Sequence, residues 1–169
     1  MIDHDKSGHS SLSIVLIGAS SSVTRMTSTD TGAEGLRIRG YEHVGVRVSS
    51  TERAIAFYRD LGFDLVEHIP EAGAAELTTR DGATRINLIF NGRTDAAGYN
   101  ILQDCSDKHP GLTHLALVVD SLDAAQVFLK ERGIPVTEGP HPIGRRRVAL
   151  FFRDPDGNVI ELNEMLEVA

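Results

Sequence analysis

The chain has 169 residues, of which 41% are hydrophobic and 24% charged, a composition typical of a globular protein with one core of ordinary size. Its formal net charge of −7 and isoelectric point near 5.4 argue against nucleic acid and anionic membranes as partners, since both attract basic faces. The single cysteine, Cys105, has no partner for an internal disulfide and indicates a reduced, cytoplasmic thiol.

The first 40 residues are rich in Ser, Thr and Gly, so they offer little apolar surface to bury. The apolar run at residues 13–19 is too short to span a bilayer, and the start of the chain lacks the basic region of a signal peptide. We therefore expect residues 1–40 to be a flexible or weakly ordered N-terminal extension.

A regular pattern begins at residue 41. Apolar and polar side chains alternate over residues 41–48, which predicts a strand. Ser49 and Glu52 form a capping box, which predicts a helix from that point to Gly62. Short strands are then expected at residues 63–69, 74–79 and 83–91.

The same order starts again after a loop at residues 92–110. Residues 112–119 read as a strand, and Asp120 or Ser121 caps a helix that Gly133 ends. Further strands are expected at residues 134–138, 146–152 and 159–163.

The chain is therefore an internal repeat of strand, helix and three strands. We predict an α+β fold in which two paired βαβββ modules form a concave, partly open sheet with the helices outside. A single domain would span residues 41–165. Module one would cover residues 41–91, the linker 92–110 and module two 111–165.

The repeat aligns four polar residues. His43 is followed after 44 residues by Asn87, and His114 is followed after 47 residues by Glu161, so the two pairs occupy equivalent places. Glu161 lies in an apolar strand, where a carboxylate needs a hydrogen bond, an ion pair or a cation. Strand alternation places all four on the concave surface, where they can converge.

Two imidazoles and one carboxylate form a ligand set that suits one divalent ion, and Ni, Zn, Co, Mn and Fe all fit it. His43, His114 and Glu161 are the expected ligands. The amide of Asn87 either adds a weak fourth ligand or orients a ligand or water.

Other polar residues share this surface or its rim. Alternation adds Arg47 and Asn91 to the surface. The basic run at residues 145–147 is either a solvated strand edge or a guard that attracts an anionic substrate. The remaining histidines have no comparable pattern and are read as surface or loop residues.

Three motifs resemble the vicinal oxygen chelate superfamily, which includes glyoxalase I, extradiol dioxygenases, methylmalonyl-CoA epimerase and bleomycin-binding proteins. They are HVGVRV from residue 43, LTHLALVVD from residue 112 and DPDGNVIELNE from residue 154. The resemblance implies that His43, His114 and Glu161 carry the metal.

Glyoxalase I is the most similar family in layout. The resemblance implies that Arg47, Asn91 and a basic residue, Arg145 or Arg147, lie near a glutathione moiety. Asn87 departs from the pattern, because glyoxalase I has a metal-binding glutamate at that place. One carboxylate, Glu161, would then move the proton beside the substrate carbonyl.

Three functions follow from the resemblance. The first is a metal-dependent lyase or isomerase that chelates two adjacent substrate oxygens and stabilises an enediolate or oxyanion. The second is an Fe(II) extradiol-type dioxygenase acting on a small catechol-like substrate. The third is a non-catalytic binding protein of the bleomycin-resistance type.

The implied partners are a small-molecule substrate, such as a glutathione or other thiol adduct, and a second copy of the chain in a homodimer. Some relatives build each site from two chains. The sequence leaves open whether His43 and His114 meet within one chain or across an interface.

Overall fold

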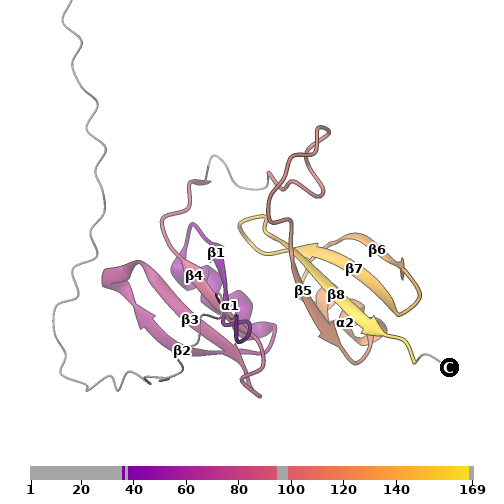
Figure 1. Cartoon of the computed structure of the whole chain (residues 1–169), viewed down its shortest axis with the longest axis horizontal. Helices are drawn as coiled ribbons and strands as arrows, with labels where there is room; N and C mark the ends of the chain where they lie inside the picture. Colours follow the sequence, from indigo (N-terminus) through magenta and orange to yellow (C-terminus); the bar gives the residue numbers. More distant parts are fainter. Residues whose placement is uncertain (1–35, 37, 95–98, 168–169) are drawn as a thin grey trace, which may run out of the picture. The chain divides into compact units, whose positions relative to one another are not determined.

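Two four-stranded sheets, each accompanied by one α-helix, make up the described part of the chain in a computed structural model (Figure 1). The structure describes residues 36, 38–94 and 99–167. The expectation for residues 1–40 therefore falls almost wholly outside the described residues. From Gly40 onward the chain forms one compact unit.

The first sheet has the strand order β1-β4-β3-β2. Strand β1 runs parallel to β4, and the other pairs are antiparallel. Its elements are β1 (Val44–Arg47), α1 (Thr51–Asp60), β2 (Phe63–Ile69), the 3-10 helix η1 (Pro70–Ala72), β3 (Ala74–Thr79) and β4 (Arg85–Ile89).

The second sheet repeats this arrangement with the order β5-β8-β7-β6 and a parallel β5–β8 pair. Its elements are β5 (Leu115–Val119), α2 (Leu122–Glu131), β6 (Val136–Ile143), β7 (Arg147–Arg153) and β8 (Val159–Met165). The predicted α+β fold of two repeated modules is confirmed.

The first helix begins one residue later than predicted. Ser50 is its N-cap and its hydroxyl accepts from the backbone N–H of Arg53, so the capping box starting at Ser49 is wrong. Ser49 is engaged elsewhere, because its hydroxyl and its N–H both bind the Asp156 carboxylate. The second cap is confirmed: Ser121 accepts from the N–H of Ala124.

Several strand predictions have the wrong length. Strands β1 and β5 each begin three residues later than expected. Strand β6 continues to Ile143, five residues beyond its expected end. Strand β4 stops at Ile89, because Asn91 takes a φ of 66°, which no extended strand contains. Asn91 therefore leaves the side-chain alternation that Asn87 follows.

Apolar residues of both modules share one core. Its largest fully buried side chains are Tyr58, Phe152, Leu77, Ile86, Leu88, Leu129, Leu150, Ile160 and Val48. The ring of Phe57 on α1 lies 6.4 Å from that of Phe152 on β7, so the first helix packs on the second sheet. Each such buried side chain contributes roughly 1.5–3 kcal/mol, which makes the two sheets a rigid platform for the residues on their other faces.

The turn before β8 ties the modules together through buried polar groups. Asp154 accepts from the Tyr58 hydroxyl at 3.1 Å and from the backbone N–H groups of Asp156 and Asn158. Burial raises the pKa of the Asp154 carboxyl, although these hydrogen bonds oppose the shift. Burial, with the adjacent Asp154 carboxylate, raises the pKa of the Tyr58 phenol well above 10. Arg53 adds an ion pair to Asp156 at 2.9 Å.

No helix in the described part of the chain is long and apolar enough to span a membrane.

Candidate metal and substrate site

The strand register places the four aligned polar residues equivalently. Gly45 on β1 lies opposite Asn87 on β4, and Ala116 on β5 lies opposite Glu161 on β8. Each histidine comes two residues before the small residue of its pair. The equivalence expected from the sequence spacing is therefore present in both sheets, on the faces turned away from the core.

Glu161 is the most buried carboxylate on these faces, with only 4% of its side chain exposed. Its Oε2 lies 2.7 Å from Nε2 of His114. The His114 ring in turn meets the ring of Phe151 edge to face at 5.8 Å. The Nε of Arg147 stays 3.8 Å from Glu161 Oε1, beyond hydrogen-bond range. His114 is thus the direct partner that the buried carboxylate requires.

Both histidines are held at Nδ1 by the residue before them. Nδ1 of His114 lies 2.8 Å from the Thr113 hydroxyl, and Nδ1 of His43 contacts the Glu42 carboxylate. The hydrogen bond to His43 lowers the pKa of the Glu42 carboxyl. Orientation at one ring nitrogen, with the other directed to an ion, is the usual arrangement of metal-binding histidines. Nε2 is the nitrogen that remains for an ion in both rings.

A carboxylate that the sequence reading missed lies opposite Asn87. Glu76 on β3 pairs with Asn87 in the register, and core burial of Ala75 and Leu77 turns Glu76 toward the same face. Arg85 binds Glu76 at 2.9 Å and Glu42 at 3.3 Å. Period-2 alternation in residues 74–79 was the signal that could have found Glu76.

Three polar atoms on these faces are buried without a hydrogen-bond partner among the described residues. They are Oδ1 of Asn87, Oδ1 of Asn163 and Nε of Arg147. Buried polar atoms are normally paired, so such atoms indicate positions where a ligand, ion or water binds. Asn87 lies on β4, Arg147 on β7 and Asn163 on β8.

The expected substrate-binding residues are spread out. Arg47 donates from Nη1 to the Phe90 carbonyl at 2.5 Å and, with His114, lines a cleft of about 150 Å³ that β1 and β5 share. Asn91 is exposed beyond the end of β4. Arg145 is exposed in the turn between β6 and β7, and Arg147 is the basic residue of that run that approaches Glu161.

The donor set suits a divalent ion, although no three His, Cys, Asp or Glu side chains gather closely enough to form a metal cluster within residues 38–94 and 99–167. Nε2 of His114 and Oε2 of Glu161 already face each other. The first module carries Nε2 of His43 and the unpartnered amide oxygen of Asn87, and neither is joined to this pair by a hydrogen bond or ion pair among the described residues. Neutral imidazole, carboxylate and amide oxygen are ligands for Zn, Ni, Co, Mn or Fe ions.

The end of the linker covers part of the second sheet. Arg153 donates two hydrogen bonds to the Asp104 carboxylate, at 2.7 and 2.9 Å, and these lower the pKa of Asp104. Leu102 packs on the apolar residues beside Glu161, which are Ala149, Phe151 and Val159. A segment without periodicity in the sequence is thus fixed against the candidate site.

Comparisons with known proteins identify the family of this chain. Residues 40–162 match the sequence profile of the Glyoxalase/Bleomycin resistance protein/Dioxygenase superfamily. The Glyoxalase domain-containing protein RDO1 of Mycosarcoma maydis is 31% identical over 136 residues, covering 76% of this chain and 69% of that protein. The mitochondrial methylmalonyl-CoA epimerase of Homo sapiens is 30% identical over 130 residues, covering 72% of each chain.

A solved structure adds a relative of another kind. TnmS3, an antibiotic binding protein from Streptomyces sp. CB03234, superposes with a TM-score of 0.58 at 29% identity. The match covers 77% of this chain and all of that protein. An enzyme and a binding protein are therefore similar to this chain at nearly the same sequence identity.

Proposed function

Because the chain belongs to the Glyoxalase/Bleomycin resistance protein/Dioxygenase superfamily, we propose that it is a divalent-metal-dependent enzyme of the lyase or isomerase type. Its reaction would move a proton at a carbon next to a carbonyl group. The observation that carries the proposal is the buried Glu161 carboxylate, 2.7 Å from Nε2 of His114, in a register that the His43 and Asn87 pair repeats.

His43, His114 and Glu161 would hold the ion, with Asn87 as a weak ligand or an orienting group. When bound, the ion supplies a Lewis acid that polarises two adjacent substrate oxygens. The Nδ1 contacts from Glu42 and Thr113 support this assignment, because they orient both rings at Nδ1 while Nε2 of His114 faces Oε2 of Glu161. The unpartnered Asn87 oxygen supports its place beside the ligands.

Glu161 would take the proton from the carbon beside the carbonyl, since its carboxylate is poorly solvated and therefore reactive. Glu76 would be a second acid or base, because it lies opposite Asn87 on the corresponding face of the first sheet. Arg85 orients Glu76 through an ion pair at 2.9 Å. Two carboxylates on different modules allow proton removal and return by different groups, as an epimerisation needs.

The substrate would be a small acyl compound with two adjacent oxygens, carried on a thiol such as glutathione or coenzyme A. The similarity to methylmalonyl-CoA epimerase supports the acyl-thiol class. Arg47 supplies a cation beside the shared cleft for the anionic part of such a carrier. We expect the enzyme to act as a homodimer.

The test is metal loading followed by proton exchange in deuterated water. Purified protein with Zn, Ni, Co, Mn or Fe(II) is incubated with methylmalonyl-CoA or with the hemithioacetal of methylglyoxal and glutathione. We expect metal-dependent deuterium incorporation or product formation that Glu161→Gln abolishes. Equal activity in protein treated with a chelator would contradict the proposal.

A non-catalytic binding protein is the second candidate. It is favoured by the absence of a three-residue cluster in the described part of the chain and by the likeness to the antibiotic binding protein TnmS3. The dioxygenase alternative is tested by incubating the Fe(II)-loaded protein with a catechol. A dioxygenase would consume oxygen in this assay. Saturable ligand binding without metal dependence, exchange or oxygen uptake would favour the binder.

A further inference from the structure

Asn163 is a buried amide that the proposed reaction leaves unused. It lies on β8 two residues beyond Glu161, on the same face, with only 5% of its surface exposed. Its Oδ1 is buried and has no hydrogen-bond partner within the described residues. An unpaired buried amide destabilises a fold, so its presence beside a candidate site indicates a binding role.

The strands beside Asn163 carry short side chains at its register positions. Its register partners are Ala149 on β7 and Val118 on β5, which carry small side chains, and Val118 is 69% exposed. The equivalent residue of the first module is Ile89, which pairs with Arg47 as Asn163 pairs with Val118. The fold therefore accepts an aliphatic side chain at this position, as Ile89 shows in the first module, whereas the second module has the polar Asn163.

Arg147 extends past Asn163 toward the metal-ligand pair. Its backbone lies opposite Met165, yet its Nε lies 3.8 Å from Oε1 of Glu161. Asn163 comes between Met165 and Glu161 on that face of β8. The arginine side chain therefore runs along the sheet beside Asn163, and its own Nε is buried and unpartnered. The two side chains form a polar strip that leads away from Glu161.

We propose that Asn163 determines substrate specificity by pairing with an amide or hydroxyl group of the substrate, about 7 Å from the group held at Glu161. The spacing is that of two residues along a strand. This inference rests on the proposed function, since it assigns the second part of the same substrate. The substrate class is an acyl compound whose chelating head is joined by a short spacer to a hydrogen-bonding group.

Two synthetic ligands test the pairing directly. N-Oxalylglycinamide has adjacent oxygens at one end and a primary amide at the other. In N-oxalylglycine methyl ester a methoxy group replaces the terminal NH2, so the terminal N–H donors are lost while the internal amide N–H is kept. With Zn²⁺ in excess, calorimetry should give about tenfold tighter binding of the amide to the wild-type protein. Asn163→Leu should bind both ligands equally. Equal binding by the wild type, or a preference that survives in Asn163→Leu, would overturn the proposal.

Thermal stability gives a readout that needs no ligand. Because the amide is unpaired, Asn163→Leu should raise Tm by about 2–4 °C, and Asn163→Val serves as a smaller second variant. The matched control is Asn158→Leu, which should lower Tm because the Asn158 amide donates to Arg47 and Asp154. A fall in Tm for both Asn163 variants would overturn the proposal, since the amide would then have a structural partner.

The two arms separate this inference from the proposed function. If neither ligand binds the zinc-supplemented protein while Asn163→Leu raises Tm, the result contradicts chelation at Glu161 and supports an unpaired amide oxygen at Asn163. If both ligands bind with equal affinity and only when zinc is present, the result supports chelation at Glu161 and contradicts the role of Asn163.

Discussion

The two modules share a fold but present different faces to a ligand. In the first module, exposed His43 contacts Glu42, and Arg85 links that carboxylate to Glu76 in a solvated ionic chain. In the second module, Glu161 is buried against His114, and Leu102 of the anchored linker packs on the apolar residues beside it. The same strand register therefore supports a direct contact between His114 and Glu161 in the second module, whereas in the first module His43 contacts Glu42.

This difference follows from single positions in the repeat. Asn87 replaces a carboxylate at the place of Glu161, and the carboxylate of the first module stands on the neighbouring strand as Glu76. The proposed division of labour is that the second module fixes the ion and the first completes its shell and supplies a second acid or base. Each prediction below changes one side of the comparison.

The largest effect is expected from removing the preassembled ligand. Glu161→Gln keeps the shape of the side chain but removes the charge, so zinc affinity should fall at least about 100-fold. The equivalent change in the first module, Asn87→Ala, should cost only about tenfold, because an amide is a weaker ligand. Competition titration with a zinc-binding dye measures both. Equal losses would contradict the assigned asymmetry.

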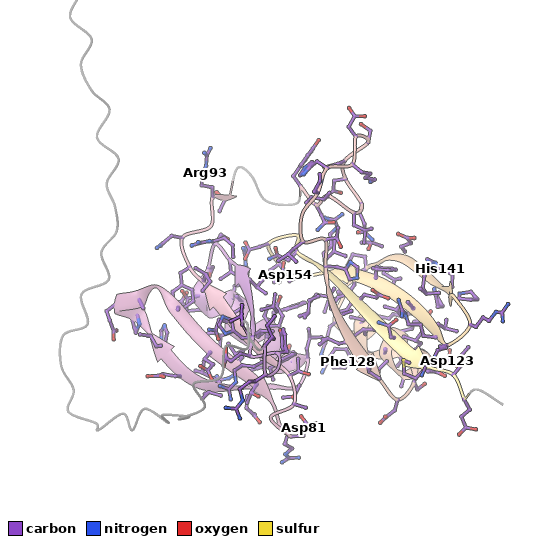
Figure 2. The ribbon with its side chains drawn as sticks, in the orientation of Figure 1. Asp81, Arg93, Asp123, Phe128, His141 and Asp154 are labelled. Atoms are coloured by element: carbon purple, nitrogen blue, oxygen red, sulfur yellow. The ribbon has the colours of Figure 1, made fainter. Side chains whose placement is uncertain are left out.

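The turns before β4 and β8 should differ in their effect on stability. Asp154 is buried with several hydrogen bonds, so Asp154→Ala should lower the free energy of unfolding by about 3 kcal/mol in urea titrations. Asp81, in the equivalent turn, is solvent-exposed, and among the described residues it accepts hydrogen bonds from Thr79 and Ala83 (both aspartates are labelled in Figure 2). Asp81→Ala is the matched control and should change stability little. A larger loss for Asp81→Ala would contradict the account.

Releasing the anchored linker, residues 99–113, from the second sheet should have a smaller effect on stability. Arg153→Ala removes two charge-assisted hydrogen bonds to Asp104 and should lower the free energy of unfolding by about 1–2 kcal/mol after solvent screening is considered. Hydrogen exchange should accelerate in residues 99–113 and stay unchanged in β1 to β4. Unchanged exchange in the linker would show that the packing of Leu102 and the hydrogen bond from Thr137 to Gln103 hold it without Arg153.

The smallest effect concerns pH. Tyr58 has a pKa raised above that of an unfolded tyrosine, so the folded state retains the phenol proton more strongly. Its contribution is complete below pH 10 and is lost as the pH rises further. Tyr58→Phe should be about 1 kcal/mol less stable at pH 8, and this gap should narrow between pH 10 and 11. Urea titrations across that range measure it, and a gap that widens would contradict the assignment.

Much of the fold could be predicted because both modules show alternating apolar and polar side chains in their strands and similar intervals between equivalent residues. The valines of β1 and the apolar residues of β5 mark the core faces, and the intervals from histidine to Asn87 and Glu161 predict the register found. The first cap was misplaced because Ser49 and Ser50 are both competent, and a contact with Asp156, 107 residues away, decides between them. Glu76 was missed because its role depends on which strand lies beside β4, and a single sequence does not state strand order.

The most direct test of the account is a zinc titration followed by NMR of the histidine ring nitrogens. We expect one equivalent of zinc per chain to shift the Nε2 signals of His43 and His114 together and to leave those of His68 and His141 unchanged. Loss of both shifts in Glu161→Gln would complete the assignment. A saturable shift of His114 alone, or no saturable binding, would contradict a metal site built from both modules.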